Sequence, residues 1–178
     1  MGYAGGSKEH PTYHDLGDHA ETIQIDYDPT RISYGDLLHM FWQSHTPTRR
    51  SWSRQYASII FFHNEEQKRL AMETRDHEEA RTGTKMHTEI LPYSRFYLAE
   101  DYHQKYRLQQ ERELMNEFIL IYPDPLDFVN STAAARVNGY LSGYGSRESL
   151  AGEIATLGLS AEAGKTLVKL VSTPRGLL

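Results

Sequence analysis

The chain has 178 residues, a formal net charge of −5 and a sequence pI near 6.0, so its charge gives no indication of a nucleic-acid surface. No apolar run approaches the ~20 residues of a membrane span, and the N-terminus lacks the basic-then-apolar pattern of a signal peptide, so we expect no membrane contact and take the cytoplasm as the default location. The absence of cysteine excludes disulfides, thiolate metal sites and a cysteine nucleophile among these residues.

The first part of the chain is rich in turns and ends in a predicted strand. Glycines at residues 2–6 are followed by Pro11-Thr12-Tyr13 and His19-Ala20-Glu21. From Thr22 to Tyr27, isoleucine and tyrosine alternate with polar residues, which predicts a strand with one buried face. Glu21 stands where the loop feeds this strand. Desolvation there would make it a candidate proton donor, and the alternative is a solvated carboxylate at the strand end.

Three histidines, His10, His14 and His19, fall close together beside two aspartates. Imidazole and carboxylate groups are good ligands for zinc or iron, so the cluster allows a metal site. The histidine spacings would suit a helix, but a proline and a glycine between them argue against one. We expect no resident metal and keep metal binding as a weaker alternative.

Helix signals are clearest in the middle of the chain. Ser33 predicts an N-cap, with Asp36 as its capping-box partner and an apolar stripe of core residues behind it. Asn64 opens a long, highly charged helix that reaches Thr82, and Gly83 ends it. Apolar runs predict strands at residues 56–62, 87–91 and 95–98.

Beyond residue 106 the pattern becomes helical. An apolar face at Leu114, Phe118 and Ile121 predicts one helix, and a second is expected over residues 128–137. Two further helices are predicted at residues 146–157 and 160–171, each begun by a serine. We therefore predict one domain over residues 1–106 and a helical C-terminal extension over 107–178.

Several ordered motifs resemble one known family. The segments GYAGG, PTY, HAE and YDPTRISY, in this order, are similar to the opening half of a peptide methionine sulfoxide reductase of the A type (MsrA). HTPT at residues 45–48, QYAS at 55–58 and AEDYHQKY at 99–106 agree with it. The resemblance covers residues 2 to 106. It implies an α+β fold, with a mixed β-sheet, flanking helices and a ferredoxin-like core.

The resemblance also implies a chemistry, the thiol-dependent reduction of methionine S-sulfoxide in oxidised proteins or peptides. Glu21 would be the acid, and Tyr13 and Tyr56 would hydrogen-bond the sulfoxide oxygen. Tyr102 and His103 would lie on the substrate side, unless this segment is only a hydrogen-bonded turn. No bound cofactor is implied, and thioredoxin or another thiol would be the external reductant.

The sequence departs from the family pattern in three places. The family's cysteine nucleophile lies in a GCFW motif upstream of GYAGG, whereas here Met1 directly precedes Gly2. The loop 44–55 lacks the usual glycine-asparagine-aspartate segment, and Leu141 occupies the place of a resolving cysteine in a weakly matching glycine-rich tail. We therefore expect a truncated form with little or no activity and reduced stability. The alternative is a catalytically dead module that binds methionine sulfoxide or regulates a complete copy.

Overall fold

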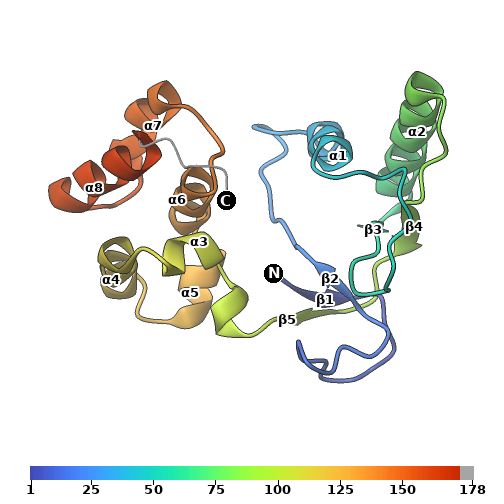
Figure 1. Ribbon diagram of the computed structural model, residues 1–178, viewed down its shortest axis with the longest axis horizontal. Coiled ribbons are helices and arrows are strands. Elements are labelled where there is room, and N and C mark those ends of the chain that lie inside the picture. Colours follow the sequence, from blue (N-terminus) through green and yellow to red (C-terminus); the bar gives the residue numbers. More distant parts are fainter. Residues whose placement is uncertain (173–178) are drawn as a thin grey trace. The chain divides into compact units, whose positions relative to one another are not determined.

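The computed structural model describes residues 1–172 and divides the chain into two compact units, Met1–Glu100 and Asp101–Leu178 (Figure 1). The strands of the described residues belong to the first unit, and the second is helical. This arrangement confirms the predicted α+β class with a mixed set of strands, flanking helices and a helical C-terminal part. No helix within residues 1–172 is long and apolar enough to cross a membrane.

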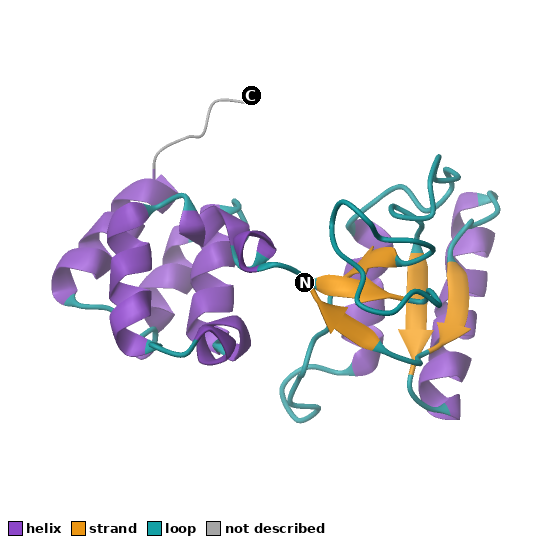
Figure 2. Cartoon of the chain, turned by 90° about the horizontal axis from the view of Figure 1, so that it is seen from below, coloured by secondary structure: helices purple, strands orange, loops and turns teal. Residues whose placement is uncertain are grey.

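The strands of the first unit form two small sheets (Figure 2). The bounds are β1 Gly2–Ala4, β2 Ala20–Thr22, β3 Ile59–Phe62, β4 Glu89–Pro92 and β5 Phe96–Leu98. In the three-stranded sheet, β1 lies between β2 and β5 and is antiparallel to both. In the second sheet β3 and β4 are parallel. A parallel pair needs a crossover connection, and the long helix between these strands provides it.

Both helices of the first unit begin at the predicted caps, and the second ends where the sequence predicts. In α1 (Tyr34–Gln43) the Ser33 side chain accepts the Asp36 backbone N–H, and the Asp36 carboxylate accepts the Ser33 N–H in return. In α2 (Glu65–Thr82) the Asn64 side chain accepts a backbone N–H of the first turn, and Gly83 ends the helix with φ of 64°. Both capping predictions are confirmed.

Each sheet of the first unit has its own small core. Leu38 and Trp42 from α1 pack with Ile60 of β3, with Ala71 of α2 and with Met86. A second cluster comprises Tyr3 of β1 with Leu16 and Ala99. Leu38 and Trp42 lie on the predicted apolar stripe of α1, and both are buried in this cluster. The prediction that the stripe belongs to the core is thus confirmed.

The predicted strand over Thr22–Tyr27 is wrong beyond its first residue. Regular pairing ends at Thr22, and the side chains of Ile23 and Ile25 are 71% and 51% exposed. On this side of the sheet the three residues of β1 pair with residues 20–22 alone, and among the described residues no strand pairs with the segment that follows. Alternation of apolar and polar residues suits a segment to a β-sheet, but the segment forms a strand only when a neighbouring strand pairs with it. The strand expected over 56–62 is likewise shorter and begins at Ile59.

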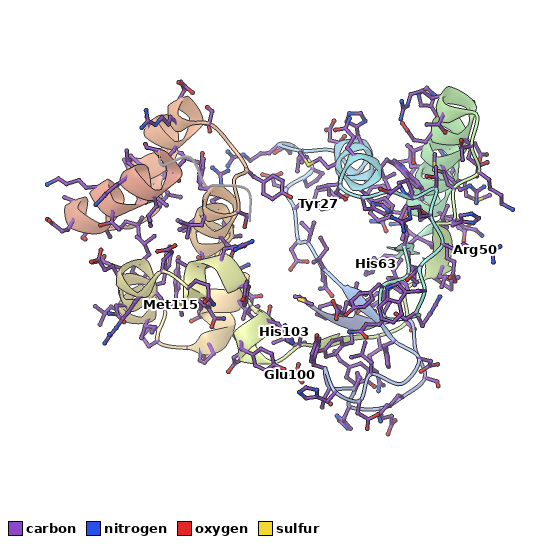
Figure 3. The ribbon with its side chains drawn as sticks, in the orientation of Figure 1. Tyr27, Arg50, His63, Glu100, His103 and Met115 are labelled. Carbon is purple, nitrogen blue, oxygen red and sulfur yellow. The ribbon has the colours of Figure 1, made fainter. Side chains whose placement is uncertain are left out.

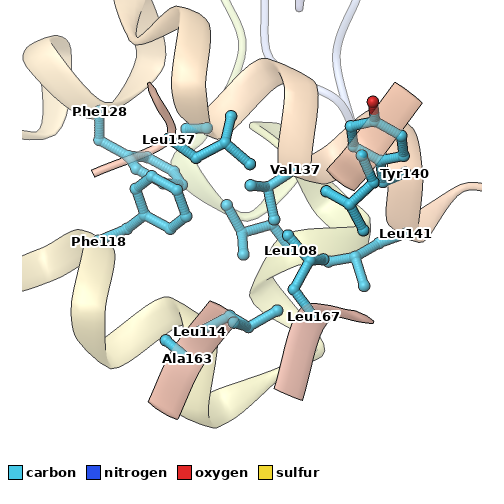
Figure 4. Packing of buried hydrophobic residues seen from close by; sticks show 12 residues of the cluster. Leu108, Leu114, Phe118, Phe128, Val137, Tyr140, Leu141, Leu157, Ala163 and Leu167 are labelled. Carbon is cyan, nitrogen blue, oxygen red and sulfur yellow. The ribbon is translucent and has the colours of Figure 1, made fainter. Parts of the chain in front are cut away.

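The second unit is a bundle of short helices around one apolar core (Figure 4). Its elements are η1 Asp101–His103, α3 Tyr106–Gln109, α4 Arg112–Ile121, α5 Pro125–Asn130, α6 Thr132–Leu141, α7 Arg147–Glu153, η2 Ile154–Thr156 and α8 Ala161–Ser172. Leu108, Leu114 and Phe118 are fully buried there. The helices begun by serine at residues 146 and 160 are confirmed.

Two predictions for this unit need correction. The single helix expected over residues 128–137 is divided between α5 and α6, because the Ser131 hydroxyl accepts the Ala134 N–H and starts a new helix. Residues 138–141, expected in a glycine-rich tail, form the last turn of α6. Leu141 is 1% exposed and belongs to the apolar core. The tail resemblance therefore does not extend to the structure.

Candidate functional site

Glu21 lies on β2, where two contacts with Gln55 hold it. Its backbone N–H donates to the Gln55 carbonyl at 2.9 Å, and the Gln55 side-chain amide donates to Glu21 Oε1 at 2.7 Å. Across the sheet, Glu21 pairs with Tyr3 of β1. The Glu21 residue is half-buried.

Tyr13 and Tyr56 come together beside Glu21. The Tyr13 side chain lies close enough to the Tyr56 hydroxyl to raise its pKa, although the two residues are far apart in the chain. Loss of water around the Tyr56 phenol is the main cause that raises its pKa, and the negative charge of Glu21 adds to it. A raised pKa keeps the phenol neutral, so it remains a hydrogen-bond donor. The structure therefore gathers all three residues that the family resemblance assigned to the sulfoxide oxygen.

Glu21 and Tyr56 line a pocket of about 750 Å³ that lies within the first unit. Tyr27 and His63, which are labelled in Figure 3, line it as well. Most of its wall is apolar: Ile23, Ile25, Leu37, Leu38, Phe41, Ile59, Phe61 and Phe96. A mostly apolar pocket with a few convergent polar groups is the usual form of a small-molecule or side-chain site.

The residues just before Glu21 have structural tasks. The His19 ring is 1% exposed and bridges two backbone groups, with Nδ1 accepting the Gly6 N–H at 3.1 Å and Nε2 2.8 Å from the Lys8 carbonyl. The Asp18 carboxylate accepts the backbone and hydroxyl of Ser7, and the backbone bond is the main cause that lowers the pKa of Asp18. These contacts fix the loop that leads into β2.

The histidine cluster does not form a metal site. No group of three potential ligands among His, Cys, Asp and Glu comes together in residues 1–172. Both ring nitrogens of His19 are used by backbone groups, and the rings of His10 and His19 both contact Tyr97, at centroid distances of 6.1 and 5.5 Å. The metal-binding alternative therefore has no geometric basis in the described residues.

Glu100 is a supporting residue that the sequence reasoning missed. One carboxylate oxygen accepts the hydroxyl of the fully buried Tyr3 at 2.6 Å, and the other accepts the Tyr13 backbone N–H at 2.9 Å. Glu100, labelled in Figure 3, thereby ties the Tyr13 loop to the central strand β1. The only sequence signal for Glu100 is its place in the AEDYHQKY motif, close to Tyr102 and His103.

Tyr102 and His103 belong to η1 in the second unit. Their rings pack together at a centroid distance of 4.2 Å, and the Tyr102 side chain is 51% exposed. The Asp101 carbonyl accepts both the Gln104 N–H and the Gln109 side-chain amide. The segment thus forms a hydrogen-bonded turn, and a substrate role for Tyr102 and His103 stays a prediction.

Two family models match the chain. The model described as peptide methionine sulfoxide reductase matches residues 1–132, and the helical domain of selenoprotein methionine sulfoxide reductase A matches residues 127–170. The chain belongs to the peptide methionine sulfoxide reductase family. The second match shows that the helical part, in which the sequence motifs faded, resembles a known domain of such reductases.

Two similar proteins match most of the sequence of this chain. A peptide methionine sulfoxide reductase of Drosophila melanogaster is 44% identical over 166 residues, which cover 90% of this chain and 65% of the relative. Peptide methionine sulfoxide reductase A5 of Oryza sativa subsp. japonica is 40% identical over 146 residues, 79% of this chain and 57% of the relative. The chain thus spans less than two thirds of the length of these relatives.

A solved structure supports the fold as well. The reduced form of Mxr1 from Saccharomyces cerevisiae superposes with a TM-score of 0.57 and 29% sequence identity. The match covers 63% of this chain and 70% of the yeast chain. The fold of the family is therefore present in this chain, as its motifs predicted.

Proposed function

We propose that this chain binds methionine (S)-sulfoxide in oxidised proteins or peptides and supplies the oxygen-binding side of a peptide methionine sulfoxide reductase site. The observation that carries the proposal is that Glu21 and Tyr56 line one pocket and that Tyr13 lies beside Tyr56. Glu21 and Tyr56 open onto the apolar pocket, which suits a thioether side chain with one polar oxygen.

Each group has a distinct task in this proposal. The Tyr13 and Tyr56 hydroxyls hydrogen-bond the sulfoxide oxygen, and Glu21 donates a proton to it as the S–O bond breaks. A thiolate attacks the methionine sulfur, takes over the oxygen as a sulfenic acid and leaves methionine as the thioether. A second thiol then reduces the sulfenic acid to a disulfide and releases water. Methionine sulfoxide is thus reduced by two electrons, and two thiols are oxidised.

The thiols must come from outside these 178 residues, because the chain contains no cysteine. Hydroxyls and amines are poor substitutes, since they are hard nucleophiles and mostly protonated at neutral pH. Thioredoxin or a similar dithiol is the reductant that the family suggests. The absence of cysteine also favours a second candidate function, a module that binds methionine sulfoxide without reducing it.

Calorimetric titration with two matched peptides tests the proposal. One peptide carries methionine sulfoxide and the other carries methionine at the same position. We expect the chain to prefer the sulfoxide, and Glu21→Ala to lose about tenfold or more in affinity for it. Glu9→Ala, an exposed carboxylate of the same unit, is the control and should bind normally. Equal affinity for the two peptides would refute the proposal.

A turnover assay then separates the two candidate functions. The bound sulfoxide peptide is incubated with thioredoxin or a small dithiol, and methionine is quantified by mass spectrometry. Reduction above the rate without the chain, and its loss in Glu21→Ala, would identify a reductase half-site. Binding without any accelerated reduction would identify the binding module.

A further inference from the structure

The loop before Tyr56 presents a tryptophan directly beside the candidate site. The Trp52 side chain is 84% exposed, and its ring lies 5.3 Å from the ring of Tyr56 between centroids, tilted by 53°. A short turn sets this position, because the Ser51 hydroxyl donates to the Ser53 carbonyl at 2.7 Å and accepts the Ser53 N–H. Trp52 is therefore exposed to solvent next to Tyr56 of the proposed sulfoxide site.

Isolated exposed apolar residues are common on protein surfaces, so exposure alone indicates nothing. Trp52 differs in that the ring it contacts, Tyr56, is itself 46% exposed and belongs to the site. Tryptophan is among the residues that contribute most to binding when a partner covers them. The other tryptophan, Trp42, is 6% exposed and packs in the core, as is usual for this side chain.

The same loop is strongly basic. No aspartate or glutamate occurs between Asp36 and Glu65, whereas residues 49, 50 and 54 are arginines. Arg54 forms an ion pair with Glu89 at 2.6 Å. Arg49 and Arg50 are exposed, and within residues 1–172 neither has an ion-pair partner (Figure 3 labels Arg50). In a chain with net charge −5, this loop is a local positive surface.

We propose that Trp52 is a substrate-contacting specificity residue, and that Arg49 and Arg50 direct the site to methionine sulfoxide flanked by acidic residues. The indole would pack on the oxidised side chain or its peptide backbone as the sulfoxide oxygen reaches Tyr56. Arg50 and Arg49, which precede Trp52 by two and three residues, would attract carboxylates near the oxidised methionine. This inference rests on the proposed function, because it assumes that the sulfoxide is bound at Tyr56.

Fluorescence and calorimetric titrations of the full chain with three short sulfoxide peptides test the inference. The peptides carry glutamates, alanines or lysines on both sides of one methionine sulfoxide. We expect the glutamate peptide to bind several-fold to about tenfold more tightly than the lysine peptide, and added salt to reduce this difference. The exposed Trp52 should also change its emission on binding.

Variants assign the effect to individual side chains. Trp52→Ala should weaken binding of all three peptides by about tenfold, and Trp52→Phe by less. Arg49→Glu with Arg50→Glu should reverse the preference between glutamate and lysine peptides. The controls, Tyr144→Ala (a tyrosine that is 74% exposed) and the exposed Arg112→Glu, both belong to the second unit and should change neither result.

The outcomes separate this inference from the proposed function. If the wild-type chain binds the sulfoxide peptides but shows no flank preference, and Trp52→Ala binds as well as wild type, the inference is overturned and the proposed function stands. If the wild-type chain binds none of the peptides, both fail. Circular dichroism of each variant confirms that a lost signal does not come from unfolding.

Discussion

Replacement of His19 by leucine tests whether buried hydrogen bonds hold the strand that carries Glu21. The ring is 1% exposed and lies two residues before Glu21. Its Nδ1 accepts the Gly6 N–H at 3.1 Å, and its Nε2 lies 2.8 Å from the Lys8 carbonyl, which together require the tautomer protonated on Nε2. His19→Leu keeps most of the side-chain volume and removes both contacts.

The expected cost follows from these two bonds. A neutral hydrogen bond contributes a net ~0.5–1.5 kcal/mol, and a buried polar group that loses its partner costs ~1–3 kcal/mol. Gly6 and Lys8 are only half-buried, so water can reach part of each orphaned group. We therefore expect His19→Leu to lower the free energy of unfolding by about 2–4 kcal/mol.

Urea denaturation followed by circular dichroism measures this free energy, and hydrogen exchange of the Gly6 amide localises the effect to the first unit. The exchange measurement matters because two compact units need not unfold in a single transition. His77→Leu, on the exposed face of α2, is the control and should stay within about 0.5 kcal/mol of wild type. A His19→Leu change that is equally small would refute the reasoning.

Two further predictions concern the core and the site. Leu114→Ala removes a fully buried side chain and should cost ~2–5 kcal/mol in urea denaturation, whereas Leu120→Ala, 79% exposed, should cost less than about 0.5 kcal/mol; equal costs would contradict the assigned core. Tyr56 should stay neutral to a higher pH than an ordinary tyrosine, so any stability linked to its neutral form is lost only as pH rises through its raised pKa. NMR titration of isotope-labelled tyrosines should show Glu21→Gln lowering this pKa part-way, because desolvation remains; an unchanged titration would exclude the charge effect.

Features of the fold that depend on neighbouring residues could be predicted from the sequence. The capping box of Ser33 and Asp36 and the ends of α2 at Asn64 and Gly83 are set by contacts within a few residues. The same holds for the serine caps of the C-terminal helices. Such signals act locally, so one sequence is enough to read them.

Features that depend on distant partners could not be predicted in this way. The segment after Thr22 has the alternation of a strand, but whether it pairs depends on a neighbour elsewhere in the chain. The contacts of Glu100 with Tyr3 and Tyr13 join residues 97 and 87 positions apart, and Gln55 reaches Glu21 across 34. No local pattern encodes such contacts. Only the family resemblance brought Tyr13, Glu21 and Tyr56 into one hypothesis before their positions were known.

The contacts that position this group bear on how binding relates to reduction. Gln55 holds Glu21, and Glu100 holds the backbone of Tyr13, whose side chain lies beside Tyr56. All of these residues lie in the first unit, and none of the contacts requires a thiol. The proposed oxygen-binding side can therefore be formed without the nucleophile that would attack sulfur. Under the proposed function, recognition of the sulfoxide and its reduction are separable properties, so binding by this cysteine-free chain should be measurable before any reductant is added.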